Sequence, residues 1–354
     1  MKKRWAVKKI MWRNRELLFV MAVSMSVVIS IPLGFQLKHR HDEVKLGVSF
    51  SIKYATELGL DWKQAYTALL DDLEVKQLRL MSYWDLSEPA NDEYMFEDLD
   101  WQISQAEQAG ASVSLALGQR QPRWPECHIP RWTSEVDEAT RNAQLLEYIT
   151  EVVNRYKDNP AVISYQVENE ASNARFGDCP EYDADFLKQE IELVKSIDPE
   201  STVITNVSNQ SGTPLFGPVQ SADKVGFSIY KNAHFDALGN KYGWSFWYVP
   251  SQWHGMRAAL VEGLIGTETF VHELQAEPWG PDATVNLSIQ EQNKTMDAES
   301  LRSITEFAKQ TGMKEVYLWG GEWWYWRLIE HNDTELWDAA KIMLQEANVS
   351  ALAD

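Results

Sequence analysis

Several sequence signatures of common catalytic sites are missing from this chain. No glycine-rich phosphate loop follows the first predicted strand, where residues 49–53 read Ser-Phe-Ser-Ile-Lys, so a nucleotide-binding site is disfavoured. The sequence also has no His-Glu-x-x-His and no Gly-x-Ser-x-Gly, which argues against a zinc-protease helix and a serine nucleophile elbow. We expect neither a metal nor a cofactor in the site.

Basic residues are scarce after residue 43. The 354 residues carry 33 Lys/Arg against 52 Asp/Glu, a formal net charge of −19, and residues 1–43 hold nine of the basic residues but only three of the acidic ones. The acidic remainder repels phosphate backbones, so we expect no nucleic-acid partner. The length of the whole chain suits one α/β barrel with a short appendage.

The N-terminal segment joins a basic stretch to a long uncharged run. Seven Lys/Arg lie within residues 1–15, and Leu17–Phe35 contains no charge. As a helix these 19 residues span roughly 28 Å, close to the thickness of a bilayer core. We predict a cytoplasmic segment at 1–16, an uncleaved transmembrane signal anchor at 17–37, a linker at 38–43 and an extracytoplasmic domain at 44–354. The alternative is a cleaved signal peptide and a secreted domain.

Cys127 and Cys179 are the only cysteines. They fall in the predicted loops after the third and fourth strands. In an oxidising compartment we expect a disulfide between these loops, with two unpaired thiols as the alternative.

Short β-rich runs alternate with amphipathic helical stretches from residue 46 onward. The predicted strands are residues 46–50, 77–81, 112–117, 161–167, 202–205, 225–230, 269–273 and 316–319. The predicted helices are residues 61–73, 98–108, 138–156, 185–197, 253–262, 298–309 and 334–346. Eight parallel strands with intervening helices favour an α/β fold of the closed (β/α)8 TIM-barrel type, with an open doubly wound sheet as the alternative.

Two of these strands end in acidic residues. In such a barrel, active sites lie at the carboxyl ends of the strands. The residues expected to face the barrel axis are Ser164, Gln166, Glu168 and Glu170 on strand four, and Thr269, Val271, Glu273 and Gln275 on strand seven. Glycoside hydrolysis needs one carboxylic acid to protonate the leaving oxygen and one carboxylate to attack or to activate water. Glu170 and Glu273 meet this requirement, although either alone could be a buried salt-bridge partner.

The two segments resemble a known family. Tyr-Gln-Val-Glu-Asn-Glu at 165–170 resembles the strand-four Asn-Glu signature of the cellulase-like retaining glycoside hydrolase superfamily, and His-Glu-Leu-Gln-Ala-Glu-Pro-Trp at 272–279 is similar to its strand-seven nucleophile segment. The likeness extends over residues 44–347. It implies Glu170 as the acid/base and Glu273 as the nucleophile of a double displacement.

The resemblance also implies roles for neighbouring residues. Asn169 would donate to the sugar 2-hydroxyl, and Arg79 would stabilise the charge of the nucleophile. Tyr230 would hydrogen-bond the nucleophile, and Trp319 would lie under the sugar at the cleavage point. The surplus of acids departs from the family pattern, and Glu277 is the second candidate for the nucleophile.

Aromatic residues are frequent near the predicted strand ends, as expected where sugars stack. Ten of the 16 tryptophans fall there: Trp84, Trp124, Trp132, Trp244, Trp247, Trp279, Trp319, Trp323, Trp324 and Trp326. We predict substrate contacts from Trp84, Trp124 and Trp279 in particular. Arg123 and His128, in the loop at 119–128, and Glu322 are further candidates.

The sequence thus predicts a retaining β-glycosidase that acts on a poly- or oligosaccharide outside the membrane. A non-catalytic carbohydrate-binding envelope protein on the same barrel would keep the tryptophans but would not need both glutamates. A metal-dependent barrel hydrolase that uses the surplus acids is a third possibility.

Overall fold

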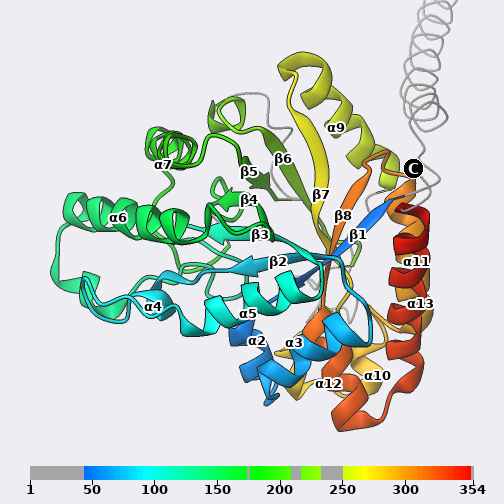
Figure 1. Ribbon diagram of the computed structural model, residues 1–354. Helices are drawn as coiled ribbons and strands as arrows, with labels where there is room; N and C mark the ends of the chain where they lie inside the picture. Colours follow the sequence, from blue (N-terminus) through cyan, green and yellow to red (C-terminus); the bar gives the residue numbers. More distant parts are fainter. Residues whose placement is uncertain (1–43, 174–175, 209–216, 233–249, 352–354) are drawn as a thin grey trace, which may run out of the picture.

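Eight parallel strands close into a barrel in the computed structural model, which describes residues 44–173, 176–208, 217–232 and 250–351 (Figure 1). The strands are β1 (Lys45–Phe50), β2 (Gln77–Met81), β3 (Ser112–Leu117), β4 (Val162–Val167), β5 (Thr202–Val207), β6 (Lys224–Ile229), β7 (Glu268–Gln275) and β8 (Glu315–Trp319). Each pairs with its sequence neighbour, and β1 closes the ring by pairing with β8 from Lys45↔Glu315 to Ser49↔Trp319. The predicted (β/α)8 barrel is confirmed, and the open sheet is excluded.

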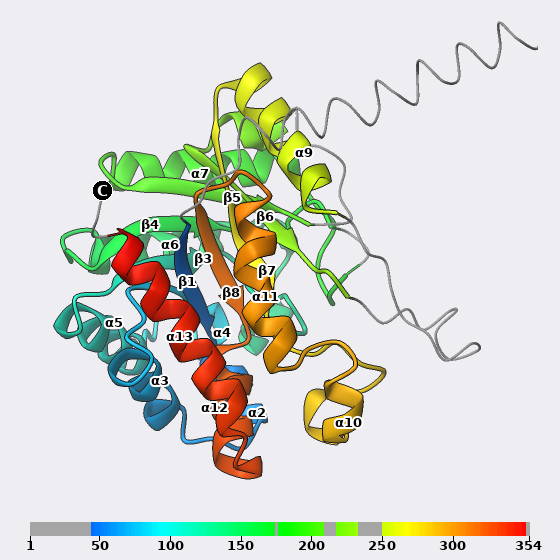
Figure 2. The same ribbon diagram turned by 90° about the vertical axis from the view of Figure 1, so that its right-hand side faces the viewer.

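Helices cover the outer face of the barrel, as the two perpendicular views show (Figure 2). They are α2 (Ile52–Glu57), α3 (Trp62–Asp71), α4 (Trp84–Ser87), α5 (Glu97–Gln108), α6 (Glu138–Tyr156), α7 (Ala184–Ile197), α9 (Ser251–Ile265), α10 (Ile289–Gln292), α11 (Ala298–Lys309), α12 (Gly321–His331) and α13 (Thr334–Ala351). Short 3-10 turns span η1 (Arg131–Glu135), η2 (Gly217–Gln220) and η3 (Thr284–Asn286). Helices α3, α6, α7 and α11 each begin after an aspartate that accepts backbone N–H groups of the first turn.

The barrel interior changes from apolar to polar toward the carboxyl ends of the strands. Ile204, Phe270 and Tyr317 form a small buried cluster of their own, apart from the larger core between strands and helices. The Tyr317 ring requires glycine at position 47, because a Cβ there would lie 2.6 Å from it. Above this layer the inward residues are polar, beginning with Ser114 Oγ and His272 Nε2 at 3.4 Å. The buried polar side chains inside the barrel therefore gather toward the carboxyl ends of the strands.

Strand β7 contains a bulge that the alternation pattern did not reveal. Phe227 of β6 pairs with Val271, but the next residue, Ser228, pairs with Glu273, so His272 is an extra residue. Val271 packs in the outer core, whereas His272 and Glu273 both point inward. The predicted inward orientation is therefore correct for Glu273 but wrong for Val271 and for Thr269, whose hydroxyl donates to Glu262 on the outer helix α9.

Helices α2, α4, α10 and α12 were not predicted. Helix α12 matters most, because the segment after β8 was expected to be a loop. Trp323 and Trp324 lie on this helix, fully buried in the core, where their indole N–H groups donate to Gln292 and to the Ala276 carbonyl. Trp326 is also buried on it. These tryptophans are packing residues rather than sugar-stacking ones.

The predicted cytoplasmic segment, signal anchor and linker, at 1–16, 17–37 and 38–43, lie outside the described residues, as do Trp244 and Trp247. Across the described ranges, no helix has the length and apolar content needed to cross a membrane.

Candidate active site

A cavity of about 610 Å³ opens at the carboxyl ends of the strands. Glu170 and Glu273 both line it, together with Asn169, Tyr230 and Trp319. The residues come from the ends of β4, β6, β7 and β8. The closed barrel therefore brings together side chains that are far apart in the sequence.

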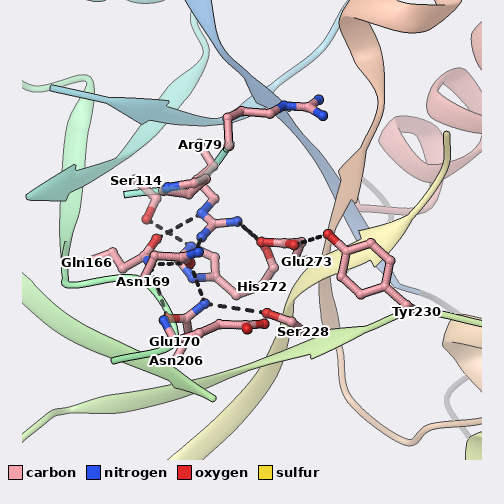
Figure 3. Close-up of polar contacts among 12 residues, drawn as sticks. Arg79, Ser114, Gln166, Asn169, Glu170, Asn206, Ser228, Tyr230, His272 and Glu273 are labelled. Carbon is pink, nitrogen blue, oxygen red and sulfur yellow. Dashed lines mark hydrogen bonds and ion pairs between the residues drawn. The ribbon is translucent and has the colours of Figure 1, made fainter. Parts of the chain in front are cut away.

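Glu273 is held by donors from two other strands (Figure 3). Arg79 Nη1, on β2, donates to Glu273 Oε2 at 2.8 Å, and the Tyr230 hydroxyl, just after β6, donates to Oε1. Arg79 is fully buried and Glu273 is 4% exposed. A buried guanidinium and a phenol fix the direction of the carboxylate and stabilise negative charge on it.

Arg79 also orients the asparagine beside the other glutamate. Its Nη2 donates to Asn169 Oδ1 at 2.8 Å, and its Nε donates to Gln166 Oε1 at 2.8 Å. Asn206 Nδ2 donates to the same Asn169 oxygen at 2.9 Å. Because Asn169 Oδ1 accepts these bonds, the orientation of the amide is fixed, and its NH2 group points away from Arg79 and Asn206.

Glu170 lies in a different electrostatic environment from Glu273. Its backbone N–H donates to Asn206 Oδ1 at 2.7 Å, and Asn173 Nδ2 donates to Glu170 Oε2 at 3.0 Å. No cation pairs with it among the described contacts. Burial, and then the negative charge of Glu273, raise the pKa of Glu170 above its ordinary value. One carboxyl group is thus biased toward the protonated form beside another that is ion-paired.

A third carboxyl group, Glu126, lines the cavity and was not singled out from the sequence. The Asn169 NH2 group donates to Glu126 Oε2 at 2.9 Å. Burial, and then the charge of Glu170, raise the pKa of Glu126 to about 8. Its position beside Cys127 in an aromatic loop was the only sequence signal that could have identified it.

The disulfide anchors this loop. Cys127 and Cys179 are bonded, with their Cα atoms 5.2 Å apart, and they connect the loops after β3 and β4. Arg120 strengthens the same junction, because its Nε donates to the Asn169 carbonyl at 2.6 Å and its Nη2 to the Phe176 carbonyl at 2.7 Å. Glu126 and Asn169 are therefore held at a fixed separation.

Glu277, the second candidate nucleophile, forms an ion pair with Arg123. Both of its oxygens accept from Arg123, at 2.5 and 3.1 Å, and Glu322 accepts from the same guanidinium at 3.2 Å. Burial raises the pKa of Glu277 to about 7, although Arg123 opposes the shift. Glu322 is 1% exposed and lies outside the cavity lining, so its predicted substrate contact is wrong and it acts by holding Arg123.

Glu168 does not face the barrel axis, contrary to the alternation pattern. Its backbone has a positive φ of 56°, as does Glu170 with 46°, so the regular alternation ends at Val167. The Glu168 carboxylate accepts from the backbone N–H groups of Gln119 and Arg120, at 2.8 and 2.7 Å. Glu168 therefore has a structural role and does not line the cavity.

The remaining predicted substrate contacts divide into two groups. Trp124, Trp279 and Trp319 line the cavity, and Trp124 is 67% exposed. Trp84 and His128 do not. Trp84 is fully buried and stacks on Tyr148, at 5.8 Å between ring centroids, because it begins helix α4 rather than lying in an open loop.

His128 and Arg79 are also too deep to touch a ligand. His128 is 2% exposed, and its Nδ1 lies 2.9 Å from Lys53 Nζ. Arg79 is 0% exposed and reaches the cavity only through Glu273 and Asn169. Trp132 packs against the core. Within the described part of the chain, no group of three or more His, Cys, Asp or Glu residues is arranged to hold a metal ion.

Comparisons with known proteins agree at the level of the fold. No family model and no curated protein matches the sequence. Among solved structures, a β-galactosidase from the psychrophilic Marinomonas ef1 superposes with a TM-score of 0.55 at 15% identity, over 87% of this chain and 60% of that one. Xylanase 10B from Thermotoga petrophila RKU-1, in complex with xylobiose, gives 0.53 at 16%, over 81% and 84%. The chain has the barrel fold of these glycoside hydrolases.

A third structure, the exo-β-1,4-mannosidase Op5Man5 from Opitutaceae bacterium strain TAV5, gives a TM-score of 0.54 at 14% identity, over 78% of this chain and 51% of that one. The chain covers 50–60% of the length of three similar β-galactosidases. The fold thus agrees with the resemblance to the cellulase-like superfamily.

Proposed function

We propose that the protein is a retaining β-glycosidase in which Glu170 is the acid/base and Glu273 the nucleophile. The observation that carries the proposal is the contrast between the two glutamates. Arg79 and Tyr230 hold Glu273 as a charge-stabilised carboxylate, whereas Glu170 is buried, lacks a cationic partner among the described residues and has a raised pKa. This is the division of labour that a double displacement needs.

The chemistry proceeds in two steps. First, Glu170 protonates the glycosidic oxygen as Glu273 attacks the anomeric carbon, which breaks the C–O bond and forms a glycosyl ester. The deprotonated Glu170 then takes a proton from water, which displaces Glu273 and regenerates both groups. Asn169, fixed by Arg79, lines the same cavity as the two glutamates and provides a positioned amide for a sugar hydroxyl.

The substrate is a β-linked poly- or oligosaccharide on this proposal. Trp124, Trp279 and Trp319 provide aromatic surfaces in the cavity, and aromatic rings stack on the apolar faces of sugars. A non-catalytic carbohydrate-binding protein would use the same tryptophans. It would not require the ion-paired Glu273 opposite Glu170, so the pair favours catalysis.

The decisive test is hydrolysis of a panel of β-linked aryl glycosides and oligosaccharides by the 354-residue chain and by Glu170→Ala and Glu273→Ala. We expect both variants to lose activity, with azide restoring Glu273→Ala and giving an α-glycosyl azide. Glu57→Ala is a matched control, because Glu57 lines the cavity but is exposed. Glycan binding without cleavage by the unaltered chain would favour the binding-protein alternative.

The acid/base assignment also predicts a pH effect. Because the negative charge of Glu273 contributes to the raised pKa of Glu170, Glu273→Gln should lower that pKa. We would measure it by infrared difference titration of the unaltered chain and of Glu273→Gln. An unchanged Glu170 titration would show that the two carboxyl groups are not electrostatically coupled.

We further propose that the barrel lies outside the cytoplasmic membrane, held by residues 17–37 as an uncleaved signal anchor. The basic residues before this run and the disulfide after it support an exported domain. Membrane fractionation with intact-mass analysis is the test. A protein that remains in the membrane at full mass supports the anchor, and a soluble protein shortened by the N-terminal segment indicates signal cleavage.

A further inference from the structure

Glu126 is a carboxyl group in the cavity that the proposed double displacement does not use. It lines the same cavity as Glu170 and Glu273 and is only 5% exposed. Burial, and then the negative charges of Glu170 and Glu273, raise the pKa of Glu126, so the three carboxyl groups are close enough to interact. A third acid is unfavourable there, because burial disfavours each charge and like charges repel. Its presence therefore calls for a role of its own.

The loop that carries Glu126 has a strained backbone. Arg120 and Cys127 pair as an antiparallel bridge, and between them the backbone N–H of Glu126 donates to the Arg123 carbonyl at 2.7 Å. Arg123 and Glu126 have positive φ values of 87° and 71°, which side chains other than glycine rarely adopt. Strain of this kind persists where the surrounding structure enforces it, and it is concentrated at functional sites. The fold thus keeps Glu126 at the cavity in spite of the strain.

Within the described part of the chain, one oxygen of Glu126 has a protein partner and the other has none. Asn169 Nδ2 donates to Oε2 at 2.9 Å, whereas no described residue donates to Oε1 or forms an ion pair with the carboxylate. Arg120 directs its Nε and Nη2 to the backbone carbonyls of Asn169 and Phe176 instead. Glu126 Oε1 is therefore available to accept a hydrogen bond from a ligand in the cavity.

Glu126 is not needed to orient Asn169. The Asn169 Oδ1 atom accepts from three other donors, Arg79 Nη2, Gln166 Nε2 and Asn206 Nδ2, at 2.8, 3.1 and 2.9 Å. Because an amide group is planar, these donors already fix the direction of its NH2 group. The cavity therefore contains a fixed donor, the Asn169 amide, bonded to a carboxyl group that can accept. A hydroxyl group, which both donates and accepts, is complementary to such a pair.

We propose that Glu126 is a specificity-determining residue, whose Oε1 accepts a hydrogen bond from the same sugar hydroxyl to which the Asn169 NH2 group donates. An ammonium group can only donate and an ether oxygen can only accept, so neither satisfies both residues. The proposal rests on the proposed function and adds the substrate class, a sugar with a free hydroxyl at this one position. Glu126 takes no part in bond breaking.

The first test crosses protein variants with altered substrates. It uses a β-linked aryl glycoside that the 354-residue chain cleaves, and its monodeoxy analogues, each of which lacks one hydroxyl. With the unaltered chain we expect one analogue to lose about 100-fold in kcat/KM, because two hydrogen bonds of about tenfold each are lost. For that same analogue, the loss should fall to about tenfold or less in Glu126→Ala and in Asn169→Ala.

Two results of this cross would overturn the proposal. If Glu126→Ala leaves the loss unchanged for every analogue, Glu126 is only a structural neighbour of Asn169. If Glu126→Ala and Asn169→Ala relieve the loss for different analogues, the two residues do not share a hydroxyl. Glu57→Gln is the matched control, because Glu57 lines the cavity but is exposed, and it should leave every loss as it is.

Glu126→Gln keeps the size of the side chain and tests the direction of the hydrogen bond. Its amide oxygen can still accept from Asn169, which turns a donor rather than an acceptor toward the sugar. We expect its preference for the hydroxyl over fluorine at the same position to be about tenfold lower than that of the unaltered chain, because fluorine cannot donate. An undiminished preference would contradict the proposal, and this variant decides the question if Glu126→Ala does not fold.

Binding separates this proposal from the proposed function. If no glycoside is cleaved, the proposed function fails, and tryptophan fluorescence titration of the unaltered chain and Glu126→Gln with the same hydroxyl and fluorine glycosides takes the place of kcat/KM. A lower preference of Glu126→Gln for the hydroxyl in binding supports the contact with Glu126. An equal preference, or no binding of any of these glycosides, overturns it.

Discussion

Removing one partner of the buried ion pair between Arg79 and Glu273 should be strongly destabilising. The two charged atoms lie 2.8 Å apart, with side chains 0% and 5% exposed. An effective dielectric constant of about 20 gives an attraction of about 6 kcal/mol at that distance. Removing one partner of a buried pair typically costs about 3–5 kcal/mol, because the other charge stays buried. We therefore expect Arg79→Met to lower the free energy of unfolding by about 3–5 kcal/mol.

A double-mutant cycle separates this charge effect from packing. Glu273→Leu should be similarly destabilising, because it leaves the Arg79 guanidinium unpaired. The double variant should cost clearly less than the sum of the two, since neither charge remains. Arg155→Met is the control, because its pair with Asp100 is 44% and 37% exposed and should contribute less than about 1 kcal/mol.

Urea unfolding monitored by circular dichroism would give the four free energies. Costs that add within about 0.5 kcal/mol would mean that Arg79 and Glu273 are not coupled. An Arg79→Met variant as stable as the control would refute the reasoning altogether. In either case the electrostatic account of the site, and with it the assignment of Glu273 as the charge-stabilised nucleophile, would need revision.

Three further predictions concern the loops and the core. Replacing Cys127 and Cys179 by serine opens a link across 52 positions and should cost about 4 kcal/mol by loop entropy, measured by unfolding with and without reductant. Trp84→Ala should lower the free energy of unfolding by about 3–5 kcal/mol without raising KM, whereas Trp279→Ala should raise KM with little loss of stability. The reverse pattern would mean that Trp84 contacts the substrate. Burial raises the folded-state pKa of Glu126 from 4.5 to about 8. The free energy of unfolding should therefore fall as pH rises between these values, because the folded state holds a proton that the unfolded state has released. Glu126→Gln should flatten that decline when unfolding is measured as a function of pH.

Much of the fold followed from the local pattern. The predicted strands at 77–81 and 112–117 and the helix at 138–156 match β2, β3 and α6, because periodicity and an aspartate cap mark their ends. The sequence analysis could place Glu170 and Glu273 in one site because the carboxyl ends of all strands lie at the same end of a barrel. Three of the missed helices, α2, α4 and α10, have only 6, 4 and 4 residues. The fourth, α12, is longer but rich in aromatic residues, a composition that suited a binding loop equally well.

The site depended on information that periodicity does not contain. The bulge at His272 and the positive φ at Glu168 change which side chains face inward, and both arise from pairing with neighbouring strands. Glu126 and Arg123 reach the cavity only because the loop after β3 folds back over it.

The sequence by itself determined the alternating strands and helices and the two glutamates at the strand ends, since these are properties of neighbouring residues along one chain. Only the tertiary structure decided which tryptophans are core and which acids are paired. The burial and pKa of a charged group depend on atoms brought near it from distant strands, and no local pattern specifies them.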